Sequence, residues 1–239
     1  MKTTRELTLE HYSTHLGRSP EMTEHVARSL ERCFADWLPA DRNAPILDAG
    51  CGEGNLLAFL RAKGYANLNG FDLSPECVRL CRERGLAFVR THDAEEIARF
   101  EGPKDGWAVI FCLDLLEHIP RERAAGFLMG LRSRLAKDGC LIVQTVNMSY
   151  LGANSVLYGD LTHEAGYTEA SLASLLSVAG FARVEIRPHW YATTWRGKAR
   201  EVYLRLLHRA VYWIEGGNAP RIASKNLLGR AYATERLPE

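Results

Sequence analysis

The sequence lacks three features that would each point to a particular class of protein. The longest unbroken apolar run, Trp107 to Leu113, is far shorter than the roughly 20 residues that cross a membrane. The first residues contain no apolar core of a secretory signal peptide. Neither sign of charge is in excess, because 30 Lys and Arg face 29 Asp and Glu. A nucleic-acid binder is usually strongly basic, so these absences predict a cytoplasmic protein that binds no nucleic acid.

The sequence also lacks a cysteine pattern that would indicate disulfides or a metal. Its six cysteines include no Cys-x-x-Cys pair, and most lie inside apolar runs. Cys77 and Cys81 are four residues apart on an expected helix, but no His or third Cys stands at ligand spacing from them. We therefore expect buried, reduced thiols and no metal site.

What the chain does contain is a repeated order of apolar strand, turn and helix, starting at residue 45. This order is typical of a parallel sheet covered by helices, and 239 residues suit one α/β domain with extensions. Expected strands are Pro45–Ala49, Leu68–Leu73, Ala87–Thr91, Trp107–Leu113, Cys140–Val146, Arg183–Arg187 and a closing strand within Lys225–Thr234. Expected helices are Leu56–Lys63, one from Pro75 to Gly85, Arg121–Ala136, and one from Thr168 to Ala179.

A glycine-rich turn follows the first expected strand, in the stretch Asp48-Ala-Gly50-Cys-Gly52-Glu-Gly54-Asn55. Glycines are needed where a ligand approaches the backbone closely, and such a turn places the ligand at the carboxyl ends of the strands. A dinucleotide fingerprint, G-x-G-x-x-G, would require glycine at Asn55, which counts against a nicotinamide dehydrogenase. No Lys-Ser/Thr pair follows, so the turn is not a P-loop.

The stretch LDAGCGEGN resembles the first motif of class I S-adenosylmethionine-dependent methyltransferases, and three further motifs follow in the family's order. FDLS ends the second strand, with Asp72 placed 22 residues after Gly50; THDAEE follows the third strand and CLDLLEHIP the fourth. The resemblance implies a Rossmann-like class I fold, with a seven-stranded, mostly parallel sheet and helices on both faces.

The resemblance also implies the donor S-adenosylmethionine, with S-adenosylhomocysteine as product. Asp72 would accept the ribose hydroxyls, Asp93 would lie near the exocyclic amine of adenine and Ala94 beside its ring. The donor-binding residues implied in this way are Asp48, Gly50, Cys51, Gly52, Gly54, Asn55, Asp72, Leu73, Asp93, Ala94 and Leu113. On this basis we expect a helical cap over residues 1–43, a methyltransferase core over 44–189, a basic aromatic insertion over 190–220, and a closing strand and tail over 221–239.

Transfer to a hydroxyl or an amine also requires a base within hydrogen-bonding reach of the acceptor. The segment YGDLTHEAGYT, residues 158–168, resembles bacterial methyltransferases found with glycan and surface-polysaccharide genes. His163 titrates near neutrality as a residue type and is the preferred general base, with Asp160 as its orienting partner. The alternative is a lid loop in which this histidine only caps the next helix.

Two other segments contain candidate catalytic groups. Asp114 ends the fourth strand, where its backbone or side chain would contact donor or acceptor, and Glu117 and His118 follow it. His118 is a second candidate base, with a structural role as its alternative. The N-terminal stretch with His11, Tyr12 and His15 would cover the donor or lie at the solvated surface.

The insertion is basic and aromatic. It carries three Trp and three Tyr, and four Arg and one Lys lie between Arg196 and Arg209 against Glu201 alone. Apolar residues recur at helical spacing and form one stripe: Val202, Leu206, Leu207, Ala210, Val211 and Ile214. Two interpretations stay open: a helix packing on the domain or in a homodimer, or a cap whose residues 195–214 approach anionic membrane lipid.

The sequence thus predicts an S-adenosylmethionine-dependent methyltransferase acting on a small-molecule or glycan acceptor. We expect O-methylation of a sugar hydroxyl in a bacterial glycan or a lipid-linked precursor. The alternatives are a quinone-pathway or natural-product O- or N-methyltransferase, and a catalytically silent donor-binding subunit. The N- and C-terminal segments differ in charge, since residues 1–43 carry a net charge of −1 and residues 190–239 one of +5.

Overall fold

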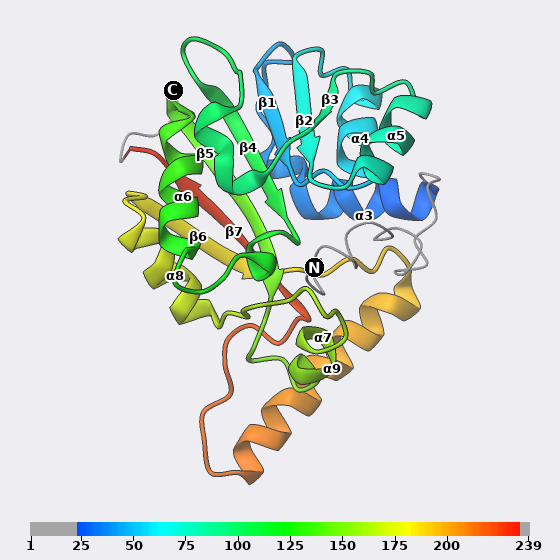
Figure 1. The fold of residues 1–239 in the computed structure, drawn as a ribbon. Helices are drawn as coiled ribbons and strands as arrows, with labels where there is room; N and C mark the ends of the chain where they lie inside the picture. The colour runs from blue at the N-terminus through cyan, green and yellow to red at the C-terminus, as the bar shows by residue number, and fades with distance from the viewer. Residues whose placement is uncertain (1–22, 235–239) are drawn as a thin grey trace.

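A computed structural model describes residues 23–234, in which seven strands form one sheet in the order β3-β2-β1-β4-β5-β7-β6 (Figure 1). The strands are β1 (Ile46–Ala49), β2 (Leu68–Asp72), β3 (Val89–Thr91), β4 (Trp107–Leu113), β5 (Leu135–Val146), β6 (Arg183–Pro188) and β7 (Asn226–Tyr232). All neighbouring pairs are parallel except the two that β7 makes, with β5 and β6. The expected Rossmann-like α/β fold is confirmed.

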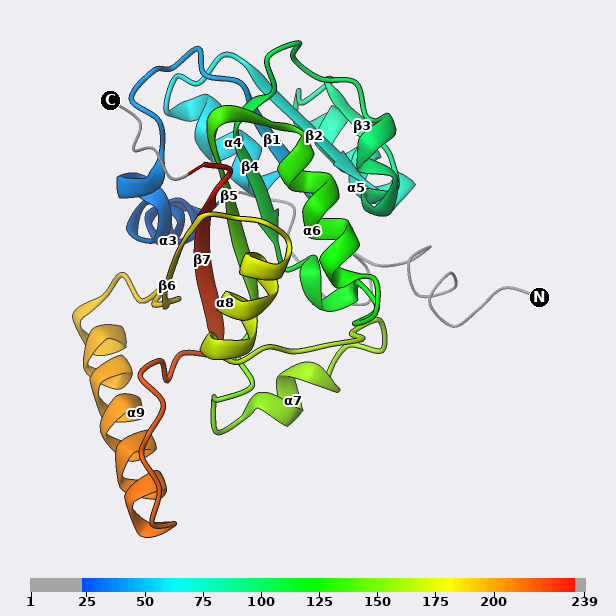
Figure 2. The same ribbon diagram turned by 90° about the vertical axis from the view of Figure 1, so that its left-hand side faces the viewer.

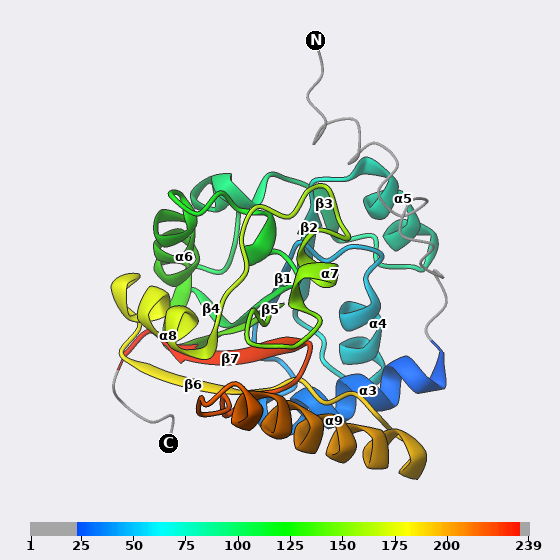
Figure 3. The ribbon, with the colours of Figure 1, turned by 90° about the horizontal axis from the view of Figure 1, so that it is seen from below.

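Helices cover both faces of this sheet. The longer ones are α3 (Glu24–Phe34), α4 (Asn55–Ala62), α5 (Pro75–Glu83), α6 (Ala124–Ser133), α8 (Glu169–Val178) and α9 (Trp195–Ile214). Shorter elements are η1 (Ala35–Trp37), η2 (Ala94–Arg99), η3 (Leu116–His118) and α7 (Ala153–Leu157). The helices α6 and α8 pack on one face, whereas α3, α4 and α5 pack on the other (Figure 3).

Local sequence signals explain where several helices begin and end. Ser74 caps α5, with its side chain accepting a hydrogen bond from Cys77 N, and Pro75 occupies the first turn. Thr168 caps α8 in a capping box with Ser171. The helix α4 is followed by Gly64 at φ 87°, a left-handed conformation that glycine adopts without strain.

The expected helix Arg121–Ala136 is too long, because α6 covers only Ala124–Ser133. Leu135, which we expected to be helical, already pairs with Trp107 of β4. The strand β5 therefore begins before Gly139 and not after it. A Cβ on Gly139 would lie 2.5 Å from the Trp107 carbonyl oxygen, so glycine allows this close approach of the two strands.

The parallel part of the sheet reverses its winding between β1 and β4, which are neighbours. In open α/β sheets, ligands bind at the carboxyl ends of the strands beside such a switch point. Both the glycine-rich turn after β1 and the Asp114 segment after β4 begin at this place. The fold thus brings the two motif regions together. No helix in the described residues is long and apolar enough to cross a membrane.

Candidate active site

The glycine-rich turn between β1 and α4 adopts a backbone that other residues would strain. Gly50, Gly52 and Gly54 have φ values of 70°, 51° and 76°. A Cβ on Gly54 would lie 2.5 Å from a methyl carbon of Leu86, whereas one on Gly52 would meet nothing within 4 Å. Gly54 is therefore needed for packing, and Gly52 leaves space above the turn.

Asp72, at the end of β2, is bonded to this turn. One carboxylate oxygen accepts a hydrogen bond from Gly52 N at 2.8 Å, and the other accepts one from Ser74 N at 2.8 Å. The side chain is half-buried and lines the cavity above the turn. The structure thus brings together two motifs that are 20 residues apart in sequence.

Asp48 is buried beneath the turn, with 3% of its surface exposed. Burial raises the pKa of its carboxyl group to about 8, and the negative charge of Asp72 contributes in the same direction. Cys51 is also held as a thiol, since its hydrogen bond with Cys81 and then its burial raise its pKa. A positive ligand in the cavity would favour the ionised form of Asp48.

The residues after β3 form the far side of the same cavity. Asp93 begins η2 by accepting a hydrogen bond from Glu95 N at 3.0 Å, and Ala94 is buried beside it. The ring of His92 packs edge-on against Phe71, with 5.3 Å between centroids. The resulting wall has an aromatic part and a carboxylate, as binding of a heteroaromatic ring with an amine requires.

A cavity of about 440 Å³ lies between these segments, within the range of small-molecule sites. Ten of the eleven predicted donor-binding residues line it; Gly54 does not, since it packs against Leu86. Glu53, which sequence reasoning missed, also lines it, and neither of its buried carboxylate oxygens has a hydrogen-bond partner among the described residues. A buried carboxylate without a partner is costly, so this wall suits a cationic ligand such as S-adenosylmethionine, which carries an ammonium and a sulfonium.

The helix α3 closes this cavity from the side, through Val26, Ser29, Leu30 and Cys33. The N-terminal segment was expected to cover the donor, and this expectation stays a prediction. His11, Tyr12 and His15 fall outside the described residues. His189 and Tyr191, from the segment between β6 and α9, line the same cavity and were also missed, because no motif singles them out.

Asp114 follows β4 in a conformation that is rare for residues other than glycine, with φ of 50°. Two side-chain amides hold its Oδ1 atom: Gln144 Nε2 at 2.7 Å and Asn226 Nδ2 at 3.2 Å. These amides come from β5 and β7, so three strands fix this carboxylate at the edge of the cavity. Backbone strain of this kind is concentrated at functional sites.

Glu117 is fully buried behind Asp114, with 1% exposure. Burial, followed by the charge of Asp114, raises the pKa of its carboxyl group well above the usual range. Its Oε2 atom accepts a hydrogen bond from Thr145 Oγ1 at 3.0 Å. Its backbone carbonyl accepts hydrogen bonds from Glu164 N at 2.7 Å and Ala165 N at 3.1 Å. Glu117 therefore anchors the loop that carries His163.

A backbone contact holds the ring of His163, and the orienting role expected of Asp160 stays a prediction. Its Nδ1 atom lies 3.0 Å from the carbonyl oxygen of Leu157. Because a carbonyl only accepts hydrogen bonds, Nδ1 carries the hydrogen and the neutral ring keeps its lone pair on Nε2. A positioned imidazole with a basic Nε2 is the arrangement that proton removal requires.

His118 lies beside His163, with 4.7 Å between the ring centroids. Its Nδ1 atom donates toward Thr162, at 2.9 Å from Oγ1 and 3.2 Å from the carbonyl oxygen. Burial, and next the neighbouring His163, lower the pKa of His118 to about 4. This ring is therefore neutral at physiological pH.

Asp160 joins this group through Thr162. Its Oδ1 atom accepts hydrogen bonds from Thr162 Oγ1 at 2.6 Å and from Thr162 N at 2.8 Å. Burial alone would raise the pKa of Asp160, but the hydrogen bonds with Thr162, together with the nearby His118 and His163, lower it below the usual value. Ligand-capable atoms of His118, Asp160 and His163 lie within 4.8 Å of one another.

A second cavity, of about 600 Å³, lies next to the first. Asp114 and His118 line both cavities, and Asp160 and His163 line the second one only. Its other walls include Tyr150, Ser155, Lys225 and Asn226. The structure thus places all three predicted catalytic residues in one cavity and ten of the eleven predicted donor residues at the other.

The methyltransferase domain family matches residues 20–186 of this chain, which is more than two thirds of its length. Curated relatives include a ubiquinone biosynthesis O-methyltransferase of Xanthomonas axonopodis pv. citri, 28% identical over 198 residues, which are 76% of this chain and 77% of the relative. Another with the same name, from Xanthomonas campestris pv. campestris, is 32% identical over 133 residues, or 54% of each chain.

Solved structures with the same fold are also methyltransferases. A SAM-dependent methyltransferase of Archaeoglobus fulgidus has a TM-score of 0.66 at 17% identity, covering 92% of this chain and 97% of its own. The magnesium protoporphyrin IX methyltransferase of Synechocystis, solved with bound SAH, has a TM-score of 0.55 at 20% identity, covering 98% and 90%. The chain belongs to the methyltransferase domain family, and it is a class I methyltransferase whose methyl donor is S-adenosylmethionine.

Proposed function

We propose that this enzyme methylates a hydroxyl oxygen of an acceptor held in the second cavity, and that His163 removes the hydroxyl proton. The observation that carries the proposal is the junction of the two cavities at Asp114 and His118. A methyl group leaving the first cavity in line would enter the second one there. The curated relatives support oxygen as the accepting atom, since they are named as O-methyltransferases.

When bound, S-adenosylmethionine supplies a methyl group on a positively charged sulfur, so the protein mainly positions the acceptor and excludes water. Asp72, Glu53 and the glycine-rich turn would hold the donor from one side of the first cavity. Asp93, Ala94 and Leu73 would hold its adenosine end. Asp48, beneath the turn, would then lie near the positive charge of the bound donor.

On the acceptor side, His163 Nε2 would take the hydroxyl proton as the oxygen–carbon bond forms and the carbon–sulfur bond of the donor breaks, which leaves S-adenosylhomocysteine in the first cavity. The hydrogen bond from Nδ1 to the Leu157 carbonyl stabilises the imidazolium that results. The carboxylate of Asp160 would also stabilise this positive charge, because one of its oxygens lies within 4.8 Å of a ring nitrogen of His163. His118, neutral at physiological pH, would line the path of the methyl group without repelling it.

Two acceptor classes follow from two different observations. The second cavity has polar walls, with Tyr150, Ser155, Lys225 and Asn226, which suit the several hydroxyls of a sugar in a glycan or its lipid-linked precursor. The curated relatives instead favour a ring hydroxyl on a quinone-pathway intermediate. Both acceptors need the same proton removal, so the role of His163 is common to them.

The experiment is transfer of a labelled methyl group from S-adenosylmethionine to a panel of acceptors. The panel contains a catechol, nucleotide-linked sugars, a lipid-linked sugar and a primary amine. Label in a hydroxylated acceptor at an alkali-stable ether supports the proposal, and the acceptor that is labelled identifies its class. Label only in the amine would contradict it. Donor binding without transfer to any acceptor would point to a catalytically silent subunit.

Repeating the assay with a chelator distinguishes two roles of these side chains, proton removal by His163 and binding of a divalent cation. If His163 acts as the base, treatment with a chelator leaves the rate unchanged. If His118, Asp160 and His163 instead hold a divalent cation, chelation abolishes transfer and added cation restores it. The second result would overturn the assignment of His163 as the base.

A further inference from the structure

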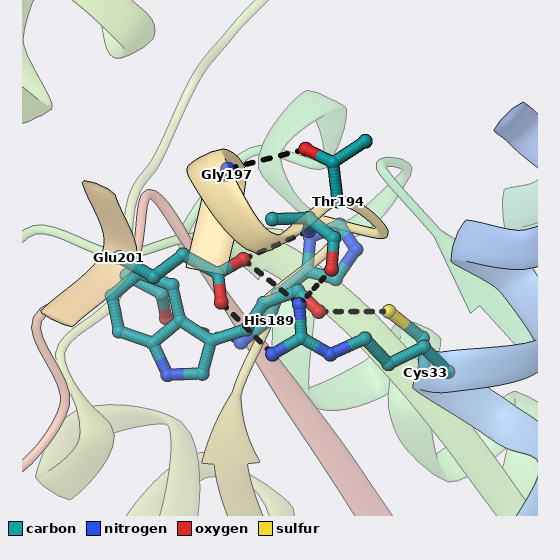
Figure 4. Close-up of polar contacts among 9 residues, drawn as sticks. Cys33, His189, Thr194, Gly197 and Glu201 are labelled. Carbon is teal, nitrogen blue, oxygen red and sulfur yellow. Dashed lines mark hydrogen bonds and ion pairs between the residues drawn. The ribbon is translucent and has the colours of Figure 1, made fainter. Parts of the chain in front are cut away.

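The helix α9 is attached to the domain along one narrow line. Of its 20 residues, Glu201 and His208 are the two buried ones. Glu201 forms a bidentate ion pair with Arg32 of α3, at 3.0 and 2.8 Å, and accepts a hydrogen bond from Ala192 N (Figure 4). His208 Nε2 donates to the carbonyl oxygen of Ser149 at 2.7 Å. From these anchors the helix runs away from the sheet (Figure 2).

The apolar stripe of α9 faces solvent, contrary to the interpretation that it packs on the domain. Val202 and Leu206 of the stripe are 48% and 59% exposed, and Trp213, which lies on the same side of the helix, is 80% exposed. At roughly 100° per residue, these three lie about 110–150° around the helix from the line of Glu201 and His208. Trp195, at the start of the helix, lies on the same side and is 75% exposed. A face with this much apolar surface is typical of an interaction site.

Cations lie along one edge of the apolar stripe and within its far half. Lys198, Arg205 and Arg209 lie between the anchored line and the edge at Val202, and Arg200 lies on the opposite side of the helix, close to Leu207. All four are exposed, as is Arg196. The only carboxylate within α9 is Glu201, which is buried and paired with Arg32. The exposed part of the helix therefore combines apolar side chains with cations and carries no exposed carboxylate.

We propose that α9 docks on the surface of an anionic lipid membrane, with Leu206 and Trp213 in the interface and the flanking cations at the headgroups. Apolar residues with aromatic ends and basic edges are what interfacial helices share. Charge complementarity favours lipid over a second copy of this chain, because two copies of this face would bring cations against cations.

The docked helix would also bring the active site to the membrane. The chain enters α9 from β6 through His189 and Tyr191, both of which line the first cavity. His189 also lies with Glu201 and Cys33 in the contact region of Figure 4. A membrane held against α9 would therefore lie close to residues of the donor site.

Flotation of the full chain with vesicles tests the proposal. The vesicles are phosphatidylcholine alone or with about 30% phosphatidylglycerol, each at about 50 and 500 mM NaCl. We expect flotation with the anionic vesicles at low salt and much less at high salt, because salt screens exposed charges. We also expect a blue shift of tryptophan emission on the same vesicles, which Trp213→Phe reduces.

Matched variants distinguish binding through α9 from an effect of the protein's overall charge. Replacing Lys198, Arg205 and Arg209 by Gln should weaken partition about 100-fold, since each cation near an anionic surface contributes about fivefold. The control replaces Arg82, Lys104 and Lys137 by Gln, which removes the same charge from exposed sites elsewhere and should leave partition within about fivefold. Leu206→Gln should weaken binding at both salt concentrations.

Three results would overturn the proposal. One is absence of flotation with anionic vesicles at low salt. A second is equal loss in the α9 and control variants. The third is a dimer in sedimentation experiments that Leu206→Gln dissociates, without flotation of the wild-type chain, which would assign the face to a second copy. None of these measurements depends on methyl transfer, so their outcome tests membrane docking separately from the proposed acceptor.

Discussion

His163 shows how a single backbone contact determines what a side chain can do. The carbonyl of Leu157 fixes the hydrogen on Nδ1, so the lone pair of the neutral ring is on Nε2. The side chain of His163 lines the second cavity. The neighbouring His118 has its Nδ1 directed to Thr162, so both rings are held by local contacts of one loop. Both histidines are candidates from the sequence, but their tautomers depend on contacts that appear only in the folded chain.

Replacing His163 by Ala should abolish most of the methyl transfer while leaving donor binding intact. Loss of a general base typically slows a reaction by about 10²–10⁴-fold. The measurement is kcat with the labelled acceptor, together with the affinity for S-adenosylhomocysteine by calorimetry. Lys137→Ala, at an exposed position that lines neither cavity, is the control. Transfer at the wild-type rate in His163→Ala would remove the base assignment.

At the scale of elements, the five-residue turn between β1 and α4 has to let the helix pack closely and also leave the cavity open. Gly54 allows α4 to begin against Leu86 and Cys81, and Gly52 leaves the cavity open while its N–H binds Asp72. The sequence predicted this turn, because glycines that alternate directly after a strand are typical of a ligand-binding turn, and the resemblance of its motif implied the ligand. It could not separate the packing glycine from the ligand-facing one.

We expect Gly54→Ala to destabilise the fold much more than Gly52→Ala. Both alanines would have to adopt a left-handed backbone, which costs about 1 kcal/mol. At Gly54 the Cβ would also lie 2.5 Å from Leu86 Cδ1 and 2.9 Å from Cys81 Sγ, so the loss should reach about 3 kcal/mol. Urea unfolding measures both variants. Equal losses would contradict the assignment of Gly54 to packing.

The helix α9 is the element whose orientation the sequence left open. Periodicity identified the stripe that contains Val202 and Leu206, and the usual inference is that such a stripe faces the core. The structure instead anchors the opposite side through Glu201 and His208. A polar anchor line cannot be recognised from spacing, because its partners Arg32 and Ser149 lie far away in sequence.

At the scale of the whole molecule, two buried acids make stability depend on pH. Asp48 lies beneath the turn after β1, and Glu117 lies behind the end of β4. Burial is the main cause of the raised pKa in each. Both shifts are consequences of assembling the sheet, since each acid belongs to an ordinary exposed peptide in the unfolded chain.

We expect the free energy of unfolding to fall as the pH rises from about 4 to about 8. Asp48 has a pKa near 8 in the folded protein and 3.8 in the unfolded chain, so between these values the folded state binds one more proton. The stabilisation by Asp48 is fully present below the unfolded pKa of 3.8 and is lost as the pH rises to the folded pKa of about 8. Over that interval the free energy of unfolding falls by at most about 1.4 kcal/mol per pH unit. Glu117 acts in the same direction.

Urea unfolding of Asp48→Asn and the wild-type protein at several pH values between 5 and 8 checks this expectation. The neutral amide cannot ionise, so the variant should gain stability relative to the wild type as the pH rises. Asp138→Asn, at an exposed position, serves as the matched control. A difference between Asp48→Asn and the wild type that does not change with pH would show that Asp48 is ionised in the folded protein.

The sequence by itself determined the fold class and the order of strands and helices along the chain, and the resemblance of its motifs implied the donor. The strands and helices rest on local signals: apolar strands, the Ser74 and Thr168 caps, and glycines whose conformation few other residues tolerate. Such signals act within a few residues, so they can be recognised along the chain without knowledge of its three-dimensional contacts.

Only the tertiary structure decided how the second cavity is built. The junction of the two cavities at Asp114 and His118 depends on amides from β5 and β7 and on a loop anchored to Glu117. The same is true of the partnerless carboxylate of Glu53 among the described residues and of the outward face of α9. Each arises from contacts between distant segments, and burial and its effect on pKa exist only once those segments have met.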